Sequence, residues 1–180
     1  MRELYRVWPA SLSSDEINRI AEIASHHPKQ DATVFSSAEA MQGIRSCTVR
    51  WLEDEWLRSL LWSYVEQANT DGFGVSVNGQ AEMQLTEYSA EHGAHYGWHH
   101  DVQWNGQSDL DRKLSVTVQL SDPAHYEGGD FEFDEVKTNA DFRSKGTVLV
   151  FPSYLRHRIH PITSGTRHAL VAWFFGPRWA

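Results

Sequence analysis

The stretch HYGWHHDVQW, residues 95–104, gathers three histidines and one aspartate among aromatic residues. His99 and Asp101 stand two positions apart, so on an extended strand both side chains face the same side and His100 points away. Imidazole nitrogen and carboxylate oxygen are both ligands for divalent transition metals. The spacing therefore predicts that His99 and Asp101 share one metal ion and need a third ligand from elsewhere in the chain.

A second histidine-bearing stretch, VLVFPSYLRHRIHPITSGTRHALVAWFF, offers His157, His160 and His168 as the third ligand. Two histidines and one carboxylate that leave other positions open form the arrangement of non-haem Fe(II) oxygenases. Zinc is also compatible with these ligand types, although the sequence has neither an H-E-x-x-H motif nor a C-x-x-C pair. The missing zinc motifs favour iron, while the ligand types alone leave zinc open.

Three motifs in order carry a resemblance to a known family. They are YSAEHGAHYGWHHD, EGGDF and FPSYLRHRIHPITSGTR, and the last places His157 ten residues before Arg167. Together they resemble the Fe(II)/2-oxoglutarate-dependent dioxygenases, specifically their prolyl 4-hydroxylase-like branch, over residues 83–177 and more loosely in IRSCTVRWL. The resemblance implies that His99, Asp101 and His157 bind Fe(II).

The same resemblance implies a pocket for the cosubstrate 2-oxoglutarate. Arg167 would pair with its distal carboxylate, since a guanidinium binds a carboxylate bidentately and stays charged when buried. Tyr88 matches the family's first tyrosine and is expected to hydrogen-bond 2-oxoglutarate. In KLSVTVQL, polar side chains alternate with apolar ones, so one face of this strand is polar. Ser115 and Gln119 on that face are further candidates for the cosubstrate pocket.

Two aromatic residues indicate the substrate. Tyr96 and Trp173 match positions that resemble the substrate-contacting aromatics of prolyl hydroxylases. The resemblance thus implies a procollagen-proline-like 4-hydroxylase whose partner is a proline-containing peptide or protein. It would use O2 and oxidatively decarboxylate 2-oxoglutarate to succinate, with L-ascorbate supporting the iron. The alternatives are hydroxylation of a free amino acid or other small metabolite, and a non-catalytic jelly-roll binding module.

Two helices are expected in the first 70 residues. Ser13 followed by Glu16 is a capping-box signature, and apolar residues then recur at helical spacing, which predicts a helix over 14–26. The same periodicity predicts a second helix over 53–69.

The remainder is rich in short β-prone runs separated by Gly, Pro, Asn and Asp. A strand is expected within 43–52, and 105–113 is expected to be an exposed loop. Within it, the segment SDLDR (108–112) is expected to be solvated and mobile and to close over substrate. These patterns predict an α+β fold, a double-stranded β-helix (jelly roll) with N-terminal helices packed on one sheet. We expect one domain over 1–180, with helical support over about 1–70 and the core over about 83–177.

The charge and the composition of the chain limit its possible binding partners and its cellular compartment. A net charge of −8 argues against a nucleic-acid partner, because phosphate binding needs a basic surface. The single cysteine, Cys47, excludes an intramolecular disulfide, and no apolar run approaches the roughly 20 residues that span a bilayer. The start of the chain has charges too early for a signal peptide, so a soluble cytoplasmic protein without a membrane partner is expected.

Overall fold

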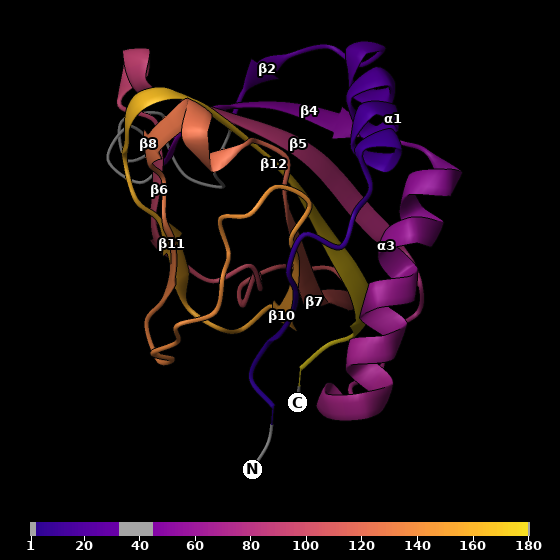
Figure 1. The fold of residues 1–180 in the computed structure, drawn as a ribbon. Helices are drawn as coiled ribbons and strands as arrows, with labels where there is room; N and C mark the ends of the chain where they lie inside the picture. Colours follow the sequence, from indigo (N-terminus) through magenta and orange to yellow (C-terminus); the bar gives the residue numbers. More distant parts are fainter. Residues whose placement is uncertain (1–2, 33–44, 180) are drawn as a thin grey trace.

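The computed structural model describes residues 3–32 and 45–179 and contains two antiparallel sheets that face each other (Figure 1). In the larger sheet, the long strand β12 is paired with β5 on one side and β7 on the other, which joins the end of the chain to its middle. The sheet runs in the order β1 (Arg6–Trp8), β10 (Val148–Pro152), β7 (Leu110–Gln119), β12 (Ile162–Pro177), β5 (Ala81–Ser89), β4 (Thr48–Leu52) and β2 (Gln30–Asp31), with β8 (Tyr126–Gly128) paired to β12.

The smaller sheet lies on the side of the larger sheet away from the helices (Figure 1). Its order is β3 (Arg45–Ser46), β6 (His95–His99), β11 (His157–Ile159) and β9 (Phe131–Phe133). A turn with Gly128 and Gly129 precedes β9. Both glycines have positive φ, 75° and 66°, a conformation that side chains with a Cβ resist.

The α-helices in the described ranges are α1 (Ser14–Ser25) and α3 (Glu55–Ala68). The shorter helical turns are the π-helical η1 (Asn69–Phe73) and the 3-10 turns η2 (Ala90–His92) and η3 (Pro123–His125). The predicted capping box begins α1: Ser13 Oγ accepts from the Glu16 amide at 3.2 Å, and Glu16 Oε2 accepts from the Ser13 amide at 2.8 Å. Asp54 caps α3 by accepting from the Leu57 amide at 2.8 Å. Both predicted helices are confirmed to within two residues.

The main hydrophobic core lies between these helices and the larger sheet. Leu57, Leu61 and Val65 of α3 are fully buried there, and they meet Val116 and Leu170 from the central strands β7 and β12. The helical residues recur every fourth position, which places them on one face. The predicted α+β layering, with helices on one sheet, is therefore confirmed.

Two expectations for single elements need correction. The strand expected within 43–52 is two strands, β3 and β4, which belong to different sheets and flank Cys47; residues 43 and 44 lie outside the described part of the chain. The segment 105–113 is not loop throughout, since β7 begins at Leu110 and the side chain of Lys113 is buried. Polar and apolar residues alternate only after Lys113, so the sequence pattern did not predict the first residues of this strand, 110–112.

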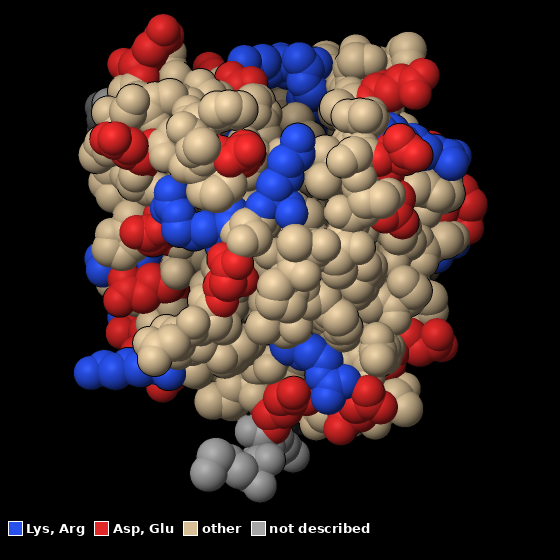
Figure 2. All heavy atoms as spheres, viewed as in Figure 1, with Lys and Arg blue, Asp and Glu red and all other residues tan. Residues whose placement is uncertain are grey.

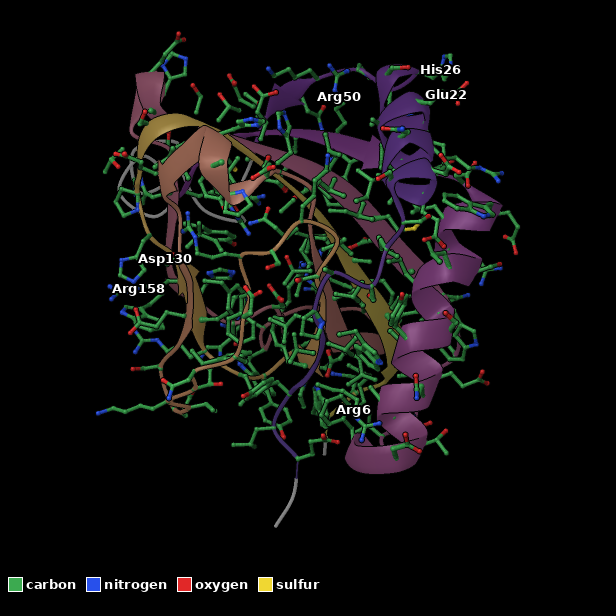
Figure 3. The ribbon with its side chains drawn as sticks, viewed as in Figure 1. Arg6, Glu22, His26, Arg50, Asp130 and Arg158 are labelled. Carbon is green, nitrogen blue, oxygen red and sulfur yellow. The ribbon has the colours of Figure 1, made fainter. Side chains whose placement is uncertain are left out.

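Acidic and basic side chains are interspersed over the face of the molecule shown in Figure 2. Many of them form ion pairs: Arg158 lies 2.7 Å from Glu132, and Arg6 lies 2.6 Å from Asp71. Figure 3 places Arg158 beside the small sheet and Arg6 near the end of α3. None of the helices in the described ranges is both long and apolar enough to cross a membrane.

Candidate metal centre and cosubstrate cavity

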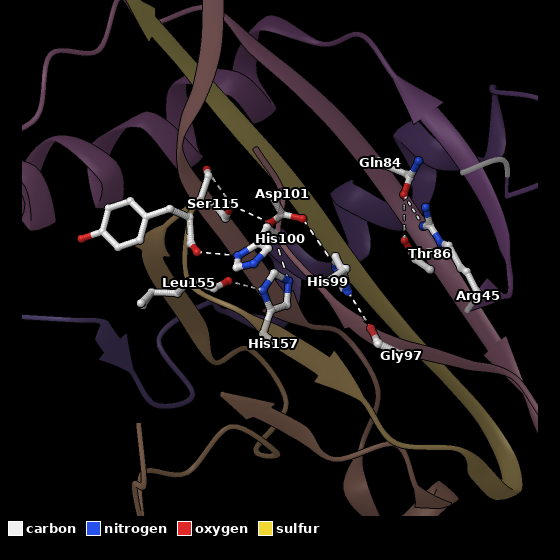
Figure 4. Close-up of polar contacts among 12 residues, drawn as sticks. Arg45, Gln84, Thr86, Gly97, His99, His100, Asp101, Ser115, Leu155 and His157 are labelled. Atoms are coloured by element: carbon white, nitrogen blue, oxygen red, sulfur yellow. Dashed lines mark hydrogen bonds and ion pairs between the residues drawn. The ribbon is translucent and has the colours of Figure 1, made fainter. Parts of the chain in front are cut away.

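His99, Asp101 and His157 come together between the two sheets (Figure 4). His99 ends β6 and lies opposite His157, the first residue of the neighbouring antiparallel strand β11. The Nε2 atoms of His99 and His157 lie 3.5 and 3.6 Å from the two carboxylate oxygens of Asp101, and one ligand atom from each residue lies within 4.8 Å of the others. Two ligands that are each about 2.1 Å from one ion lie roughly 3–3.5 Å apart, so this spacing fits a divalent metal.

The two-residue spacing predicted that Asp101 and His99 share one strand, and this prediction is wrong. Asp101 lies in a bend after β6, where its amide donates to the Ser153 carbonyl at 3.0 Å. Its side chain is held by the Ser115 hydroxyl, which donates to Oδ2 at 2.6 Å. His100 does point away, with Nδ1 against the Tyr154 carbonyl at 2.6 Å. Hydrogen bonds to β7 and to the turn after β10, rather than strand periodicity, therefore orient this carboxylate.

The protonation of the three side chains also suits a metal. Nδ1 of His99 lies 2.8 Å from the Gly97 carbonyl and Nδ1 of His157 lies 2.9 Å from the Leu155 carbonyl, so both rings can donate there and leave Nε2 as the acceptor. Burial lowers the pKa of His157 to about 4, although Asp101 opposes the shift, and the ring is neutral at pH 7. Burial alone would raise the pKa of Asp101, but His157, His99 and the Ser115 hydroxyl hold it well below its usual range.

A cavity of about 450 Å³, including its open mouth, adjoins these three residues. Four other residues singled out by the sequence line it: Tyr88, Tyr96, Arg167 and Trp173. Arg167 is only 3% exposed, yet its Nε and Nη1 have no hydrogen-bond partner among the described residues. Its guanidinium lies 5.6 Å from the centre of the Tyr88 ring. Unpaired buried donors of this kind are costly, so they indicate a ligand with acceptor oxygens.

Ser115 and Gln119 lie on the predicted polar face of β7, but neither is among the residues that line the cavity. Their side chains bond to other residues of the protein instead. Ser115 bonds to Asp101, as described above, and to Ser153 Oγ at 2.9 Å. Gln119 Nε2 donates to the Tyr126 hydroxyl at 2.6 Å. Thr117, between them on the same face, lines the cavity.

The two aromatic residues expected to contact substrate line the same cavity as the metal ligands. The Tyr96 ring stacks on the His99 imidazole, with centroids 3.4 Å apart and planes 7° from parallel. Trp173 is buried under the Arg112 guanidinium, 3.8 Å from the ring centre, and its indole N–H has no partner among the described residues. Burial raises the pKa of Tyr96 to about 12, so its hydroxyl stays protonated.

Sequence reasoning missed two polar residues of the cavity wall, Arg45 and Gln84. Arg45 Nη2 donates to Gln84 Oε1 at 2.8 Å, and Thr86 Oγ1 donates to the same oxygen at 3.3 Å (Figure 4). A signal for Gln84 was present, because Gln84, Thr86 and Tyr88 alternate along β5 and share one face. No comparable signal marks Arg45, which lies on the two-residue strand β3.

Comparison with known proteins agrees with this geometry. The model of the 2OG-Fe(II) oxygenase superfamily matches residues 83–175, which contain the three candidate metal ligands and Arg167. The chain belongs to the 2OG-Fe(II) oxygenase superfamily. Fe(II) and 2-oxoglutarate are the metal and cosubstrate expected for this family, and the three ligands and the unpaired guanidinium fit them.

Among its relatives, a PKHD-type hydroxylase from Synechococcus sp. (strain CC9311) is 30% identical over 149 residues, which cover 79% of this chain and 64% of that protein. The chain spans less than two thirds of the length of the curated relatives it matches.

Solved structures establish the fold. A Pseudomonas putida prolyl-4-hydroxylase matches with a TM-score of 0.72 and 20% identity, covering 97% of this chain and 92% of that one. The viral collagen prolyl hydroxylase of Paramecium Bursaria Chlorella virus-1, in its 2OG complex, matches with a TM-score of 0.70 and 16% identity over 97% of both chains. The predicted double-stranded β-helix of the prolyl 4-hydroxylase-like branch is therefore confirmed.

Proposed function

We propose that this protein is an Fe(II)- and 2-oxoglutarate-dependent hydroxylase that acts on peptidyl proline and forms 4-hydroxyproline. The observation that carries the proposal is the buried, unpaired guanidinium of Arg167 in the same cavity as the His99, Asp101 and His157 cluster. A metal site alone fits many proteins. A metal site beside a buried guanidinium that has unpaired donors fits a cosubstrate that chelates the metal at one end and carries a carboxylate at the other.

The three candidate metal ligands have defined parts in this proposal. His99 and His157 would bind Fe(II) through Nε2, and Asp101 through its carboxylate. Three protein ligands on one side leave coordination positions free for 2-oxoglutarate and O2. When bound, Fe(II) and 2-oxoglutarate supply the oxidative chemistry, in which 2-oxoglutarate loses CO2 to become succinate and one atom of O2 enters the substrate C–H bond.

The walls of the cavity supply binding and exclusion of water. Arg167 would hold the distal carboxylate of 2-oxoglutarate, and its burial makes that ion pair stronger than one at the surface. Tyr88, buried beside it, has a raised pKa because burial disfavours its anion, and so its hydroxyl stays a hydrogen-bond donor. Ser115 acts through Asp101, which it orients.

Two points support a prolyl substrate. Tyr96 and Trp173 present aromatic surface to the cavity, which suits an apolar five-membered ring. In addition, PKHD-type hydroxylases and prolyl 4-hydroxylases are what this chain resembles in sequence and in fold.

The proposal is tested by succinate formation from 2-oxoglutarate with Fe(II), O2 and L-ascorbate, with and without proline-rich peptides. We expect turnover that the peptides stimulate, and hydroxyproline in the product peptide by mass spectrometry. The control is His157→Ala, which removes one metal ligand and should abolish turnover while thermal unfolding shows that the variant is folded. Absence of succinate from a wild-type protein that retains iron would overturn the proposal.

A further inference from the structure

Arg45 is the second guanidinium that lines the cavity, and its hydrogen-bond partners among the described residues are uncharged. Its Nε donates to Cys47 Sγ at 3.1 Å and its Nη2 donates to Gln84 Oε1 at 2.8 Å. Its guanidinium carbon also lies 4.6 Å from the centre of the Tyr96 ring. Only these two of its five N–H donors are bonded to the described residues, which leaves donor capacity at the cavity wall.

The charge of Arg45 has no carboxylate partner in the part of the chain that the structure describes. Other arginines do: Arg58 lies 2.6 Å from Glu55, and Arg112 lies 2.5 Å from Glu82. Asp101, the buried carboxylate of the same cavity, is paired with the two histidines instead. A half-buried guanidinium without a counter-ion is costly, and a bound anion would relieve that cost.

A second donor lines the same cavity from the other sheet. Trp173 is 5% exposed, and its Nε1 has no hydrogen-bond partner among the described residues. An indole N–H can only donate, so it too calls for an acceptor atom from a ligand. Arg45 and Trp173 thus line one cavity from the small and the large sheet, respectively.

Arg45 is also close to the metal ligands. The Tyr96 ring that it contacts is the one stacked on His99, so a single aromatic ring separates the guanidinium from a metal-binding imidazole. A small substrate bound at the metal site could therefore also place one of its groups against Arg45. Arg167 already offers a partner for the distal carboxylate of 2-oxoglutarate, so the second guanidinium is left for the other occupant of the cavity.

We propose that Arg45, with the indole N–H of Trp173, binds a carboxylate of the substrate and so selects an acidic substrate for hydroxylation. The proposal rests on the hydroxylase function above and narrows its substrate class. The carboxylate belongs to a free amino acid, to the C-terminus of a peptide or to an acidic side chain next to the hydroxylated residue. A neutral, internal prolyl segment without a nearby acid would leave Arg45 unpaired.

Matched pairs of ligands test this. The protein is loaded anaerobically with Fe(II) and 2-oxoglutarate, and binding is followed by calorimetry. The pairs are L-proline and L-prolinamide, a peptide ending in proline with a free or an amidated C-terminus, and a proline peptide with Glu or Gln beside the proline. We expect at least one carboxylate member to bind roughly 10- to 100-fold more tightly than its amide, as for hydrogen bonds to a charged group. The pair that shows this difference identifies the source of the carboxylate.

Variants assign the preference to the residue. In Arg45→Gln the carboxylate and amide should bind equally, whereas Arg58→Gln, an arginine on α3 paired with Glu55, should keep the wild-type preference. The Kd for 2-oxoglutarate should not change in Arg45→Gln. Equal binding of carboxylate and amide by the wild type, or no binding of either in any pair, would overturn the proposal.

Loss of 2-oxoglutarate binding in Arg45→Gln would also overturn the proposal, since Arg45 would then hold the cosubstrate. The function proposed above has a separate readout, the formation of succinate by the wild-type protein. Succinate without any carboxylate preference would therefore remove only the present inference.

Discussion

The hydroxyl group of Ser115 offers a sharp test of how the protein orients a metal ligand. Ser115 is fully buried, and its Oγ donates to Asp101 Oδ2 at 2.6 Å. Ser115→Ala removes this donor with a change of one atom and leaves the carboxylate with fewer partners in a buried place. Loss of a contact that orients a metal ligand typically lowers metal affinity 10- to 100-fold, which equals about 1.4–2.7 kcal/mol. A hydrogen bond to a charged group, worth about 1.5–3 kcal/mol, gives the same range.

The assay is anaerobic titration of the metal-free protein with Fe(II), followed by calorimetry, in the wild type and in two variants. Ser153→Ala is the matched control, because Ser153 Oγ bonds to Ser115 Oγ at 2.9 Å, whereas only Ser115 donates a side-chain hydroxyl to Asp101 among the described residues. The backbone carbonyl of residue 153 still accepts from the Asp101 amide in the variant. We expect Ser115→Ala to lose much more affinity than Ser153→Ala, with both folded by circular dichroism. Equal Fe(II) affinity in Ser115→Ala and the wild type would refute the reasoning.

Three further predictions concern the cosubstrate and the fold. Arg167→Met should abolish the rise in Tm that 2-oxoglutarate gives the Fe(II)-loaded wild type, without lowering Tm in its absence, because the buried guanidinium has unpaired donors; a large loss of Tm without ligand would contradict this. Gly129→Ala should raise the KM for 2-oxoglutarate, since a Cβ there would lie 2.3 Å from Ile162 Cδ1 and 3.1 Å from Arg167 Cδ. Gly74→Ala shares the positive φ but meets nothing within 4 Å, so it should cost only about 1–2 kcal/mol of stability and leave that KM unchanged. Ser13→Ala, which removes the α1 cap, should lower the free energy of unfolding by about 1 kcal/mol in a urea titration, with an unchanged KM.

Some features of this protein follow from residues that are close in sequence. The start of α1 was predictable because the Ser13 and Glu16 side chains bond to each other's backbone within one turn. The polar face of β7 was predictable because strand side chains alternate. The pairing of His99 with Asp101 also needed only two residues of separation, although the bend after β6 replaced the strand that we expected.

Other features depend on contacts between residues far apart in sequence. Arg45 and Gln84 are 39 positions apart and lie on different sheets, and nothing in the local pattern of either predicts that they bond. The hydroxyl of Ser115 reaches Asp101, 14 positions away, only because the fold brings β7 next to the bend after β6. The amino-acid sequence by itself determined the helices and the polar face of β7, since both depend on local periodicity. The tertiary structure alone decided which polar groups share the cavity, because that depends on how two sheets pack against each other.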